Sequence, residues 1–454
     1  MASGAETTSE RFDPSSFSAF RFVSHELSDE GEIVLRYALD DSISFEERVT
    51  VPVPDLVAPE RWEAARALTG LLHLAAGVSY FKTAAPPAVT LEVDEPPAAV
   101  ASLLNGLYSA GLGEFAFTNG LERPPEVSFP GRGESRVRGV EPSTAALVPV
   151  GGGKDSVVAF EALRAQGAEP TLFSVGDPVP IRETARVSGL PRLIASRQIS
   201  PNLSELNRAG ALNGHVPVTA IVSCIAAITA ALNGLGRIVM ANERSASEGN
   251  LEWHGAQVNH QWSKGLEAER LLAGSIAAMA PGLEYFSLLR QASELSIARA
   301  FSALPAYHGV FTSCNSVFRL DEERRGAGWC GRCPKCRFVY LALAPFMGRH
   351  ALSQTFGHDL LGEADQYAGF AALAGVGAHK PFECVGEEEE AVAAFRMLVA
   401  LPEWADAAIV ARFDREVLAS LCPEVGSPGR VLKLSGHHEV PQDLGPAVHA
   451  ALAA

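Results

Sequence analysis

The segment best suited to chemistry combines glycines, a lysine, a carboxylate and a hydroxyl: Gly151, Gly152, Gly153, Lys154, Asp155 and Ser156. Glycines let the backbone bend sharply and bring its N–H groups close to a pyrophosphate. Lys154 can contact phosphate oxygens, and Asp155 can hold a magnesium ion. Ser156 can donate to a phosphate and can also cap a helix that begins here. The segment therefore predicts a site for a nucleotide polyphosphate and Mg²⁺.

The elements around this loop support the same interpretation. Residues 145–150 are predicted to form a strand and residues 155–166 a helix, whose amino end would face the phosphates. The loop is not a Walker A motif, because it lacks the spacer before Gly-Lys-Ser/Thr. It resembles the Ser-Gly-Gly-x-Asp-Ser signature of PP-loop ATP pyrophosphatases, with Gly151 replacing the usual serine. The resemblance implies that ATP is split into AMP and pyrophosphate. A plain glycine turn capped by Asp155 is the alternative.

Four cysteines predict a metal site. Cys330, Cys333 and Cys336 lie in one short stretch, and Cys314 lies upstream. Four soft donors are what a tetrahedral zinc ion requires, and the glycine and proline between them favour tight turns that carry ligands. An iron–sulfur cluster, which also takes four thiolates, is the alternative. A similar late zinc knuckle is found in the PP-loop enzymes that make deazaguanine nitriles.

Polar residues also follow two predicted strands, where ligands bind in a parallel sheet. Ser174 and Val175 end one strand, and the PP-loop resemblance implies that the backbone here holds adenine. Asn242 and Glu243 follow the strand predicted at residues 237–241. We expect them to contact the nucleotide or the metal, with a capped turn as the alternative.

Short apolar strands alternate with helices after residue 144, which predicts an α/β fold with a parallel sheet covered on both faces. The segments before residue 141 predict an α+β domain, and the chain after Cys336 is predicted to be mostly helical. The predicted parts are an α+β domain at residues 1–140, a PP-loop ATP-binding domain at 141–312, and a helical, zinc-bearing region at 313–454. The predicted strands lie at residues 17–23, 33–39, 43–53, 88–93, 145–150, 171–175, 192–195 and 237–241. The predicted helices lie at residues 59–80, 97–110, 155–166 and 216–232, with a further helix from the glutamates at 387–390 to about 401.

The composition is that of a globular protein and excludes some partners. The 454 residues are 47% hydrophobic and 20% charged, which suits a folded α/β chain. A net charge of -16 repels a polyphosphate backbone, so we expect no nucleic-acid partner. No apolar run approaches the roughly 18 residues that a membrane span needs, and the acidic start is unlike a signal peptide. We therefore expect a cytoplasmic protein without a membrane partner.

Two later segments gather polar side chains on predicted loops. One ends at Lys264, and the other holds Cys384 in a glycine-flanked turn. With the glycine loop, the late cysteines and the chain length, they resemble the UDP-N-acetylmuramoyl-L-alanyl-L-glutamate epimerases of peptidoglycan synthesis, from residue 148 onward. The resemblance implies a UDP-linked muramoyl dipeptide as the small-molecule substrate. The candidate catalytic residues are Lys154, Asp155, Ser156, Glu243, Lys264 and Cys384.

That family is understood to adenylate the terminal glutamate, invert its α-carbon and release AMP. Removing an α-proton beside a carboxylate would place a second negative charge on the same group. A mixed anhydride with AMP removes the first charge, so that a modest side-chain base can act. An epimerase without ATP would need two thiols flanking the carbon. Only Cys384 is placed for such a role, and a small buried hydrophobic residue is its alternative.

Two other functions are consistent with parts of the sequence. A PP-loop enzyme that modifies a nucleobase or tRNA, similar to a deazaguanine nitrile synthase or a tRNA thiolase, would share the zinc knuckle. The acidic charge and the lack of a basic patch argue against it. A noncatalytic nucleotide-binding protein would bind ATP without releasing pyrophosphate. A pyrophosphate-release assay with candidate substrates distinguishes the three.

Overall fold

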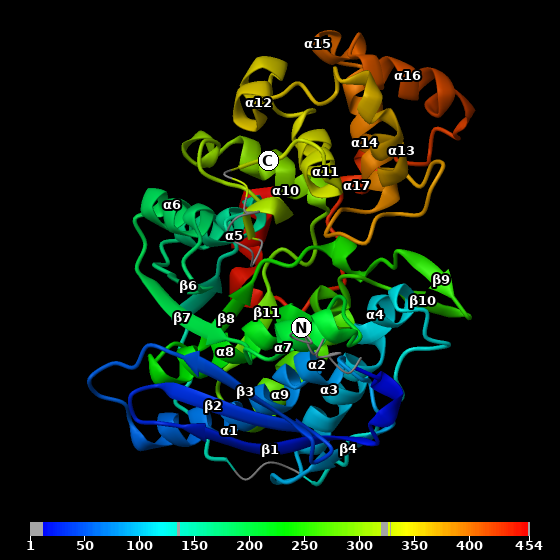
Figure 1. Ribbon diagram of the computed structural model, residues 1–454. Helices are drawn as coiled ribbons and strands as arrows, with labels where there is room; N and C mark the ends of the chain where they lie inside the picture. The colour runs from blue at the N-terminus through cyan, green and yellow to red at the C-terminus, as the bar shows by residue number, and fades with distance from the viewer. Residues whose placement is uncertain (1–11, 134–136, 319–325, 327, 453–454) are drawn as a thin grey trace, which may run out of the picture. The chain divides into compact units, whose positions relative to one another are not determined.

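The computed structural model describes residues 12–133, 137–318, 326 and 328–452, shown in Figure 1. The fold is mixed α/β, as predicted, and the chain divides into two compact units. Unit 1 comprises Met1–Val140, Ala195–Asn233 and Gly274–Pro281, and unit 2 comprises Glu141–Ile194, Gly234–Ala273 and Gly282–Ala454. The three-part division predicted from the sequence stays a prediction. Among the described residues, none of the helices combines the length and the apolar character that a membrane crossing needs.

Unit 1 is built on an antiparallel arrangement of strands, drawn in blue in Figure 1. The strand β2 pairs antiparallel with β1 and with β3, and β4 extends β1 in parallel. The last residues of β7 pair antiparallel with β3. The elements of this unit are β1 (Ala19–Leu27), β2 (Glu32–Leu39), β3 (Ile43–Thr50), α1 (Pro59–Ala76), α2 (Val78–Phe81), β4 (Ala88–Leu91), α3 (Ala98–Tyr108), α4 (Gly113–Thr118), α7 (Leu203–Ala209) and α8 (Val218–Leu232). The strands predicted before residue 94 are therefore confirmed within a few residues.

The helix α1 covers this sheet and packs against β1, β2 and α8. A single helix was predicted over residues 59–80, but the structure breaks it at Gly77 into α1 and α2. A Cβ at Gly77 would lie 2.5 Å from the Phe22 ring and 2.8 Å from the Tyr108 hydroxyl. Only glycine allows this close approach, and apolar spacing along the helix carries no sign of it.

The imidazole of His73 in α1 is fully buried beneath the sheet, 3.3 Å from the His25 ring nitrogen. Burial lowers the pKa of His73 to about 3, outweighing its hydrogen bond to the Arg36 carbonyl, which raises the pKa. The folded protein therefore keeps this imidazole neutral. In the unfolded chain the group returns to its ordinary pKa of 6.5.

We expect His73 to make the protein sensitive to acid. Between about pH 6.5 and about pH 3 the unfolded chain binds a proton that the folded chain rejects. In that window, each unit by which the pH falls should lower the free energy of unfolding by about 1.4 kcal/mol. Above pH 6.5 the free energy of unfolding should no longer depend on His73. Urea unfolding at several pH values measures the slope. His73→Asn should flatten it, whereas His449→Asn at an exposed position should not. An unchanged slope in His73→Asn would reject this origin of acid sensitivity.

Unit 2 contains parallel strands in the order β11, β8, β5, β6. Their carboxyl ends lead into the glycine loop after β5, Ser174 and Val175 at the end of β6, and Asn242 after β8. The strands are β5 (Ala146–Pro149), β6 (Thr171–Val175), β7 (Arg192–Gln198), which ends in unit 1, β8 (Arg237–Met240), β11 (Glu284–Ser287) and the separate hairpin β9 (Leu251–Trp253) and β10 (Ala256–Val258). The four strands predicted after residue 144 are confirmed, and β6 agrees residue for residue.

Helices make up most of the rest of unit 2, and those after Cys336, yellow to red in Figure 1, confirm the predicted helical region. The helix α5 packs against α10 and α18, and α10 packs against α11 and α14. The helices are α5 (Lys154–Arg164), α6 (Val179–Ser188), α9 (Leu266–Met279), which ends in unit 1, α10 (Glu294–Ser302), α11 (Pro334–Leu343), α12 (Arg349–Phe356), α13 (Tyr367–Leu373), α14 (Glu388–Val399), α15 (Pro402–Ala405), α16 (Ala408–Glu416), α17 (Pro428–Val431) and α18 (Gly445–Leu452).

Candidate functional site

The glycine loop joins β5 to α5, as predicted. Gly152 has a φ of +76°, and a Cβ there would lie 2.9 Å from the Pro180 Cβ. Both its conformation and its surroundings therefore require glycine. Gly153 is the N-cap of α5, and no described side chain caps this helix. Its first backbone N–H groups are thus left for an anion.

Ser156 does not cap α5, contrary to the prediction. The helix begins at Lys154, so that Ser156 lies within its first turn. Its hydroxyl donates to the Gly153 carbonyl at 3.3 Å rather than accepting from a backbone N–H. Its role toward phosphate stays a prediction.

Lys154 is buried among carboxylates. Only 2% of the residue is exposed, and its ammonium contacts the carboxylates of Asp155 and Glu294. Burial alone would lower the pKa of Lys154, but the two carboxylates raise it above its ordinary value. The lysine therefore stays charged. Glu294 is the first residue of α10, whose N-cap Ser293 accepts a hydrogen bond from Ser296.

Asp155, Glu243 and Glu294 offer three carboxylate oxygens that all lie within 4.8 Å of one another. Glu243 and Glu294 are buried, and Asp155 is half-buried. Burial raises the pKa of Glu294 to about 8, with a further rise from the Asp155 charge that Lys154 partly offsets. Burial and the charge of Asp155 also raise the pKa of Glu243, against the charge of Lys264. Oxygen donors crowded in this way suit Mg²⁺, and a divalent cation would relieve their repulsion.

The side chains at the ends of β6 and β8 form different hydrogen bonds. The Ser174 hydroxyl donates to the Gly176 carbonyl at 2.9 Å. Ser174 and Val175 are the last two residues of β6, directly after the three residues that pair with β5. The Asn242 amide donates to the Ser287 hydroxyl at 3.1 Å and so ties β8 to β11. Contacts of these residues with a nucleotide stay predictions.

Lys264 and Cys384 lie 120 residues apart in the chain, yet their side chains are in contact. The Lys264 Nζ donates to the Cys384 Sγ at 3.1 Å, and His260 also hydrogen-bonds this thiol. Burial opposes a thiolate, but the charges of Lys264 and Lys335 and the His260 contact lower the pKa of Cys384 well below its ordinary value. We infer a thiolate beside an ammonium, which differs from the apolar setting of a buried structural cysteine.

The guanidinium of Arg290 binds the backbone at two places, Glu243 and Lys264. It donates to the carbonyl oxygens of Glu243 and Lys264. It also forms two hydrogen bonds to the Glu269 carboxylate, at 2.9 and 2.6 Å. Both partners of this ion pair are 1% exposed, so water does not compete for it. Arg290 thereby positions Glu243 relative to Lys264.

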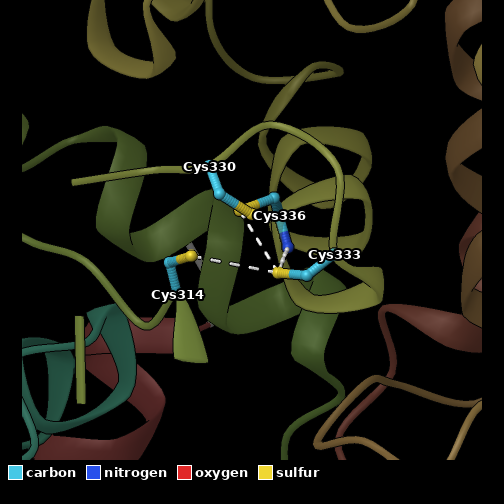
Figure 2. A group of neighbouring side chains, drawn as sticks. All are labelled: Cys314, Cys330, Cys333 and Cys336. Atoms are coloured by element: carbon cyan, nitrogen blue, oxygen red, sulfur yellow. Dashed lines mark hydrogen bonds between the residues drawn. The ribbon is translucent and has the colours of Figure 1, made fainter. Parts of the chain in front are cut away.

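The four predicted cysteines converge, as Figure 2 shows. The distances between sulfur atoms are 3.9 Å for Cys314 to Cys333, 3.7 Å for Cys330 to Cys336, and 3.4 Å for Cys333 to Cys336. A tetrahedral zinc with Zn–S bonds of about 2.3 Å separates its sulfurs by roughly 3.8 Å. All four cysteines are free, and the turn at Gly331 has a φ of +70°. The donor set therefore fits one small metal ion, whereas a four-iron cluster would spread the thiolates farther apart.

We expect purified protein to contain one zinc per chain, bound by these thiolates and mainly stabilising the fold. Cys330→Ser should lose the zinc and lower the melting temperature, while Cys422→Ser, at an exposed cysteine outside the cluster, should do neither. Elemental analysis with thermal melting measures both. Iron in the purified protein, or well-folded protein without metal, would contradict the prediction.

Three residues of the site escaped sequence reasoning. Glu294 follows the N-cap Ser293, and a serine followed by a glutamate is ordinary at the start of a helix. Nothing in this short segment therefore indicates that Glu294 contacts Lys154. Arg290 and Glu269 form a buried ion pair whose partners carry no local signal.

Comparisons with known proteins cover most of the chain. Residues 11–288 match the family described as the MurL N-terminal domain, and residues 310–425 match the MurL C-terminal domain. Three relatives are named UDP-N-acetyl-alpha-D-muramoyl-L-alanyl-L-glutamate epimerase. The one from Salinispora tropica is 49% identical over 405 residues, or 86% of this chain and 87% of the relative. Those from Xanthomonas oryzae pv. oryzae and Micromonospora sp. are 42% and 45% identical over 444 residues, covering 97% and 93% of this chain and 98% and 96% of the relatives.

Proposed function

Because the chain belongs to the MurL family, we propose that it is an epimerase that converts the terminal L-glutamate of UDP-N-acetylmuramoyl-L-Ala-L-Glu to D-glutamate. The names of the three relatives support this substrate. The reaction would serve peptidoglycan precursor synthesis in the cytoplasm, and thereby cell wall formation and cell shape.

The proposed reaction begins with activation of the terminal α-carboxylate by ATP. A carboxylate oxygen attacks the α-phosphorus, the bond between the α- and β-phosphates breaks, and pyrophosphate leaves. In the resulting mixed anhydride with AMP, loss of the α-proton gives an enolate with one negative charge instead of two. A proton then returns to the opposite face of the carbon. Water finally hydrolyses the anhydride and releases AMP.

The glycine loop and the carboxylates support the first step. The backbone N–H groups at Gly152, Gly153 and the start of α5 would bind the phosphates that leave as pyrophosphate. Lys154 would orient them, and the backbone at Ser174 and Val175 would hold adenine. Asp155, with Glu243 and Glu294, would hold Mg²⁺, which supplies positive charge for the departing pyrophosphate.

The proposed proton transfer rests on the contact between Lys264 and Cys384. The thiolate would remove the α-proton, and the ammonium and His260 would keep the sulfur ionised beforehand. The charges of Glu243 and Asp155 act on Lys264, which links this pair to the carboxylate cluster. Of the other cysteines, four lie in the metal cluster, Cys224 is buried and Cys422 lies outside the cluster at an exposed position. We therefore propose that a group other than a thiol returns the proton.

Purified protein with UDP-N-acetylmuramoyl-L-Ala-L-Glu, ATP and Mg²⁺ tests the proposal. AMP, pyrophosphate and the D-glutamyl product should form together, and omission of the muramoyl dipeptide should stop pyrophosphate release. Pyrophosphate formed only with a nucleobase or RNA acceptor would favour the nucleobase-modifying alternative. ATP binding without any pyrophosphate would favour a noncatalytic protein.

A further inference from the structure

The turn at residues 380–385 carries Cys384 and forms neither helix nor strand, although the structure describes each of its residues. Its backbone is closed by two short-range hydrogen bonds, from the Glu383 N–H to the Pro381 carbonyl and from the Val385 N–H to the Glu383 carbonyl. Bonds between residues two apart bend the chain but do not place it relative to other elements. Contacts with other segments must therefore set the position of the Cys384 sulfur.

Side chains from one segment, residues 248–264, bind this Cys384 turn at several points. The pairs are Lys380 with Glu248, the Pro381 carbonyl with Asn250, Cys384 with Lys264 and the Val385 carbonyl with Gln261, at 2.7, 2.7, 3.1 and 3.4 Å. Asn250 and Gln261 are only 8% and 3% exposed, so water competes little for their hydrogen bonds. The segment thereby holds the turn along most of its length.

Asn250 is distinct among these residues because its side chain binds the Cys384 turn and His260 at once. Its amide nitrogen donates to the Pro381 carbonyl at 2.7 Å, and its amide oxygen accepts from the His260 backbone N–H at 2.8 Å. The His260 side chain in turn hydrogen-bonds the Cys384 thiol. A carbonyl needs a donor and an N–H needs an acceptor, so an amide satisfies both. One short side chain therefore fixes the spacing between the turn and His260.

The hairpin of β9 and β10 holds Asn250 itself in place. Asn250 lies directly before β9, and its backbone N–H donates to the carbonyl of Val258, the last residue of β10, at 2.7 Å. The backbone that carries the amide is therefore fixed before the side chain meets the turn.

We propose that Asn250 is a positioning residue for proton transfer, which holds the Cys384 turn against His260 so that the sulfur can reach the substrate α-carbon. The inference rests on the proposed function, in which Cys384 is the base. A displacement of about 1 Å can slow a reaction about 10²-fold. The proposed activation by ATP uses the glycine loop and the carboxylates, so loss of Asn250 should slow inversion and spare pyrophosphate release.

Asn250→Leu removes both hydrogen bonds at similar side-chain size, and two readouts test the proposal. In the full chain with ATP, Mg²⁺ and UDP-N-acetylmuramoyl-L-Ala-L-Glu, inversion should fall about tenfold or more, while pyrophosphate release should fall less than about threefold. Without ATP or the dipeptide, alkylation by iodoacetamide is followed at the Cys384 peptide by mass spectrometry. The pH of its half-maximal rate should rise by about half a unit or more, because a displaced sulfur loses the contacts that keep it ionised. The titratable groups that act on this sulfur are Lys264, Lys335, His260 and Glu383.

Asn233→Leu is the matched control. The Asn233 amide also joins two backbone segments, because it donates at 2.9 Å to the carbonyls of Pro52 and Thr229. The control should be less stable, yet it should change neither the ratio of inversion to pyrophosphate release nor the alkylation midpoint. Either readout unchanged in Asn250→Leu, or equal changes in the control, would overturn the proposal.

Asn250→Asp decides the matter if Asn250→Leu fails to fold. It keeps an oxygen that accepts from His260 and loses the donor to the Pro381 carbonyl, so the ratio of inversion to pyrophosphate release should still fall. An unchanged ratio would reject positioning through Pro381. Alkylation needs neither ATP nor the dipeptide, so a raised midpoint in Asn250→Leu, with no inversion by the unchanged protein, would reject the proposed function alone.

Discussion

Asp155→Asn should keep its fold and lose pyrophosphate release from ATP by a factor of about 10³. The change removes one negative charge from the three-carboxylate cluster while preserving the size of the side chain. Removal of one electrostatic contact to developing charge commonly slows catalysis by about 10²–10³, and here the cation itself should also bind more weakly. Pyrophosphate release with the muramoyl dipeptide, measured at saturating Mg²⁺, gives the effect.

Asp359→Asn serves as the matched control for this change. Asp359 pairs with Arg349 at 2.7 Å and belongs to the helical region rather than to the cluster. Its variant should be less stable by about 1 kcal/mol at most and should retain turnover. Near-normal pyrophosphate release from Asp155→Asn would remove the phosphate-loop interpretation.

Cys384→Ala should separate the two halves of the reaction. Proton transfer by a positioned side chain commonly contributes about 10²–10⁴-fold, so inversion of the glutamate should fall by that factor. Attack of the carboxylate on ATP needs no proton from the α-carbon, so AMP and pyrophosphate should still form. Product stereochemistry and pyrophosphate are measured on the same sample.

The exposed Cys422 provides the control, because Cys422→Ala removes a thiol outside the metal cluster and should change neither readout. Equal losses of pyrophosphate release and inversion in Cys384→Ala would assign this residue to binding or folding. Inversion at the original rate would exclude the thiolate as the base and leave the contact with Lys264 without a catalytic role.

Features coded within one short stretch of chain were predictable. The glycine loop lies between an apolar strand and an apolar helix, and β6 was predicted with its observed bounds because its apolar run ends in a turn. The cysteines carry ligand spacing within a few residues. Each of these signals lies within a few neighbouring residues, so it can be recognised in the sequence.

Features formed by distant segments were not predictable. Lys154 meets Glu294 across 140 residues, and Lys264 meets Cys384 across 120. Lys264 and Cys384 were each identified as candidates, but nothing in either segment indicates their contact. The strand β11 is four residues long and shows no alternation that would distinguish it from a loop. Packing between elements decides such contacts.

Incorporation of solvent deuterium at the α-carbon tests the central claim most directly, namely that ATP makes the α-proton removable. In deuterated water with UDP-N-acetylmuramoyl-L-Ala-L-Glu, ATP and Mg²⁺, the terminal glutamate of the product should carry deuterium at its α-carbon. Without ATP, the ionised carboxylate resists enolisation, and no deuterium should enter. Exchange that continues undiminished without ATP would contradict activation through an acyl-adenylate.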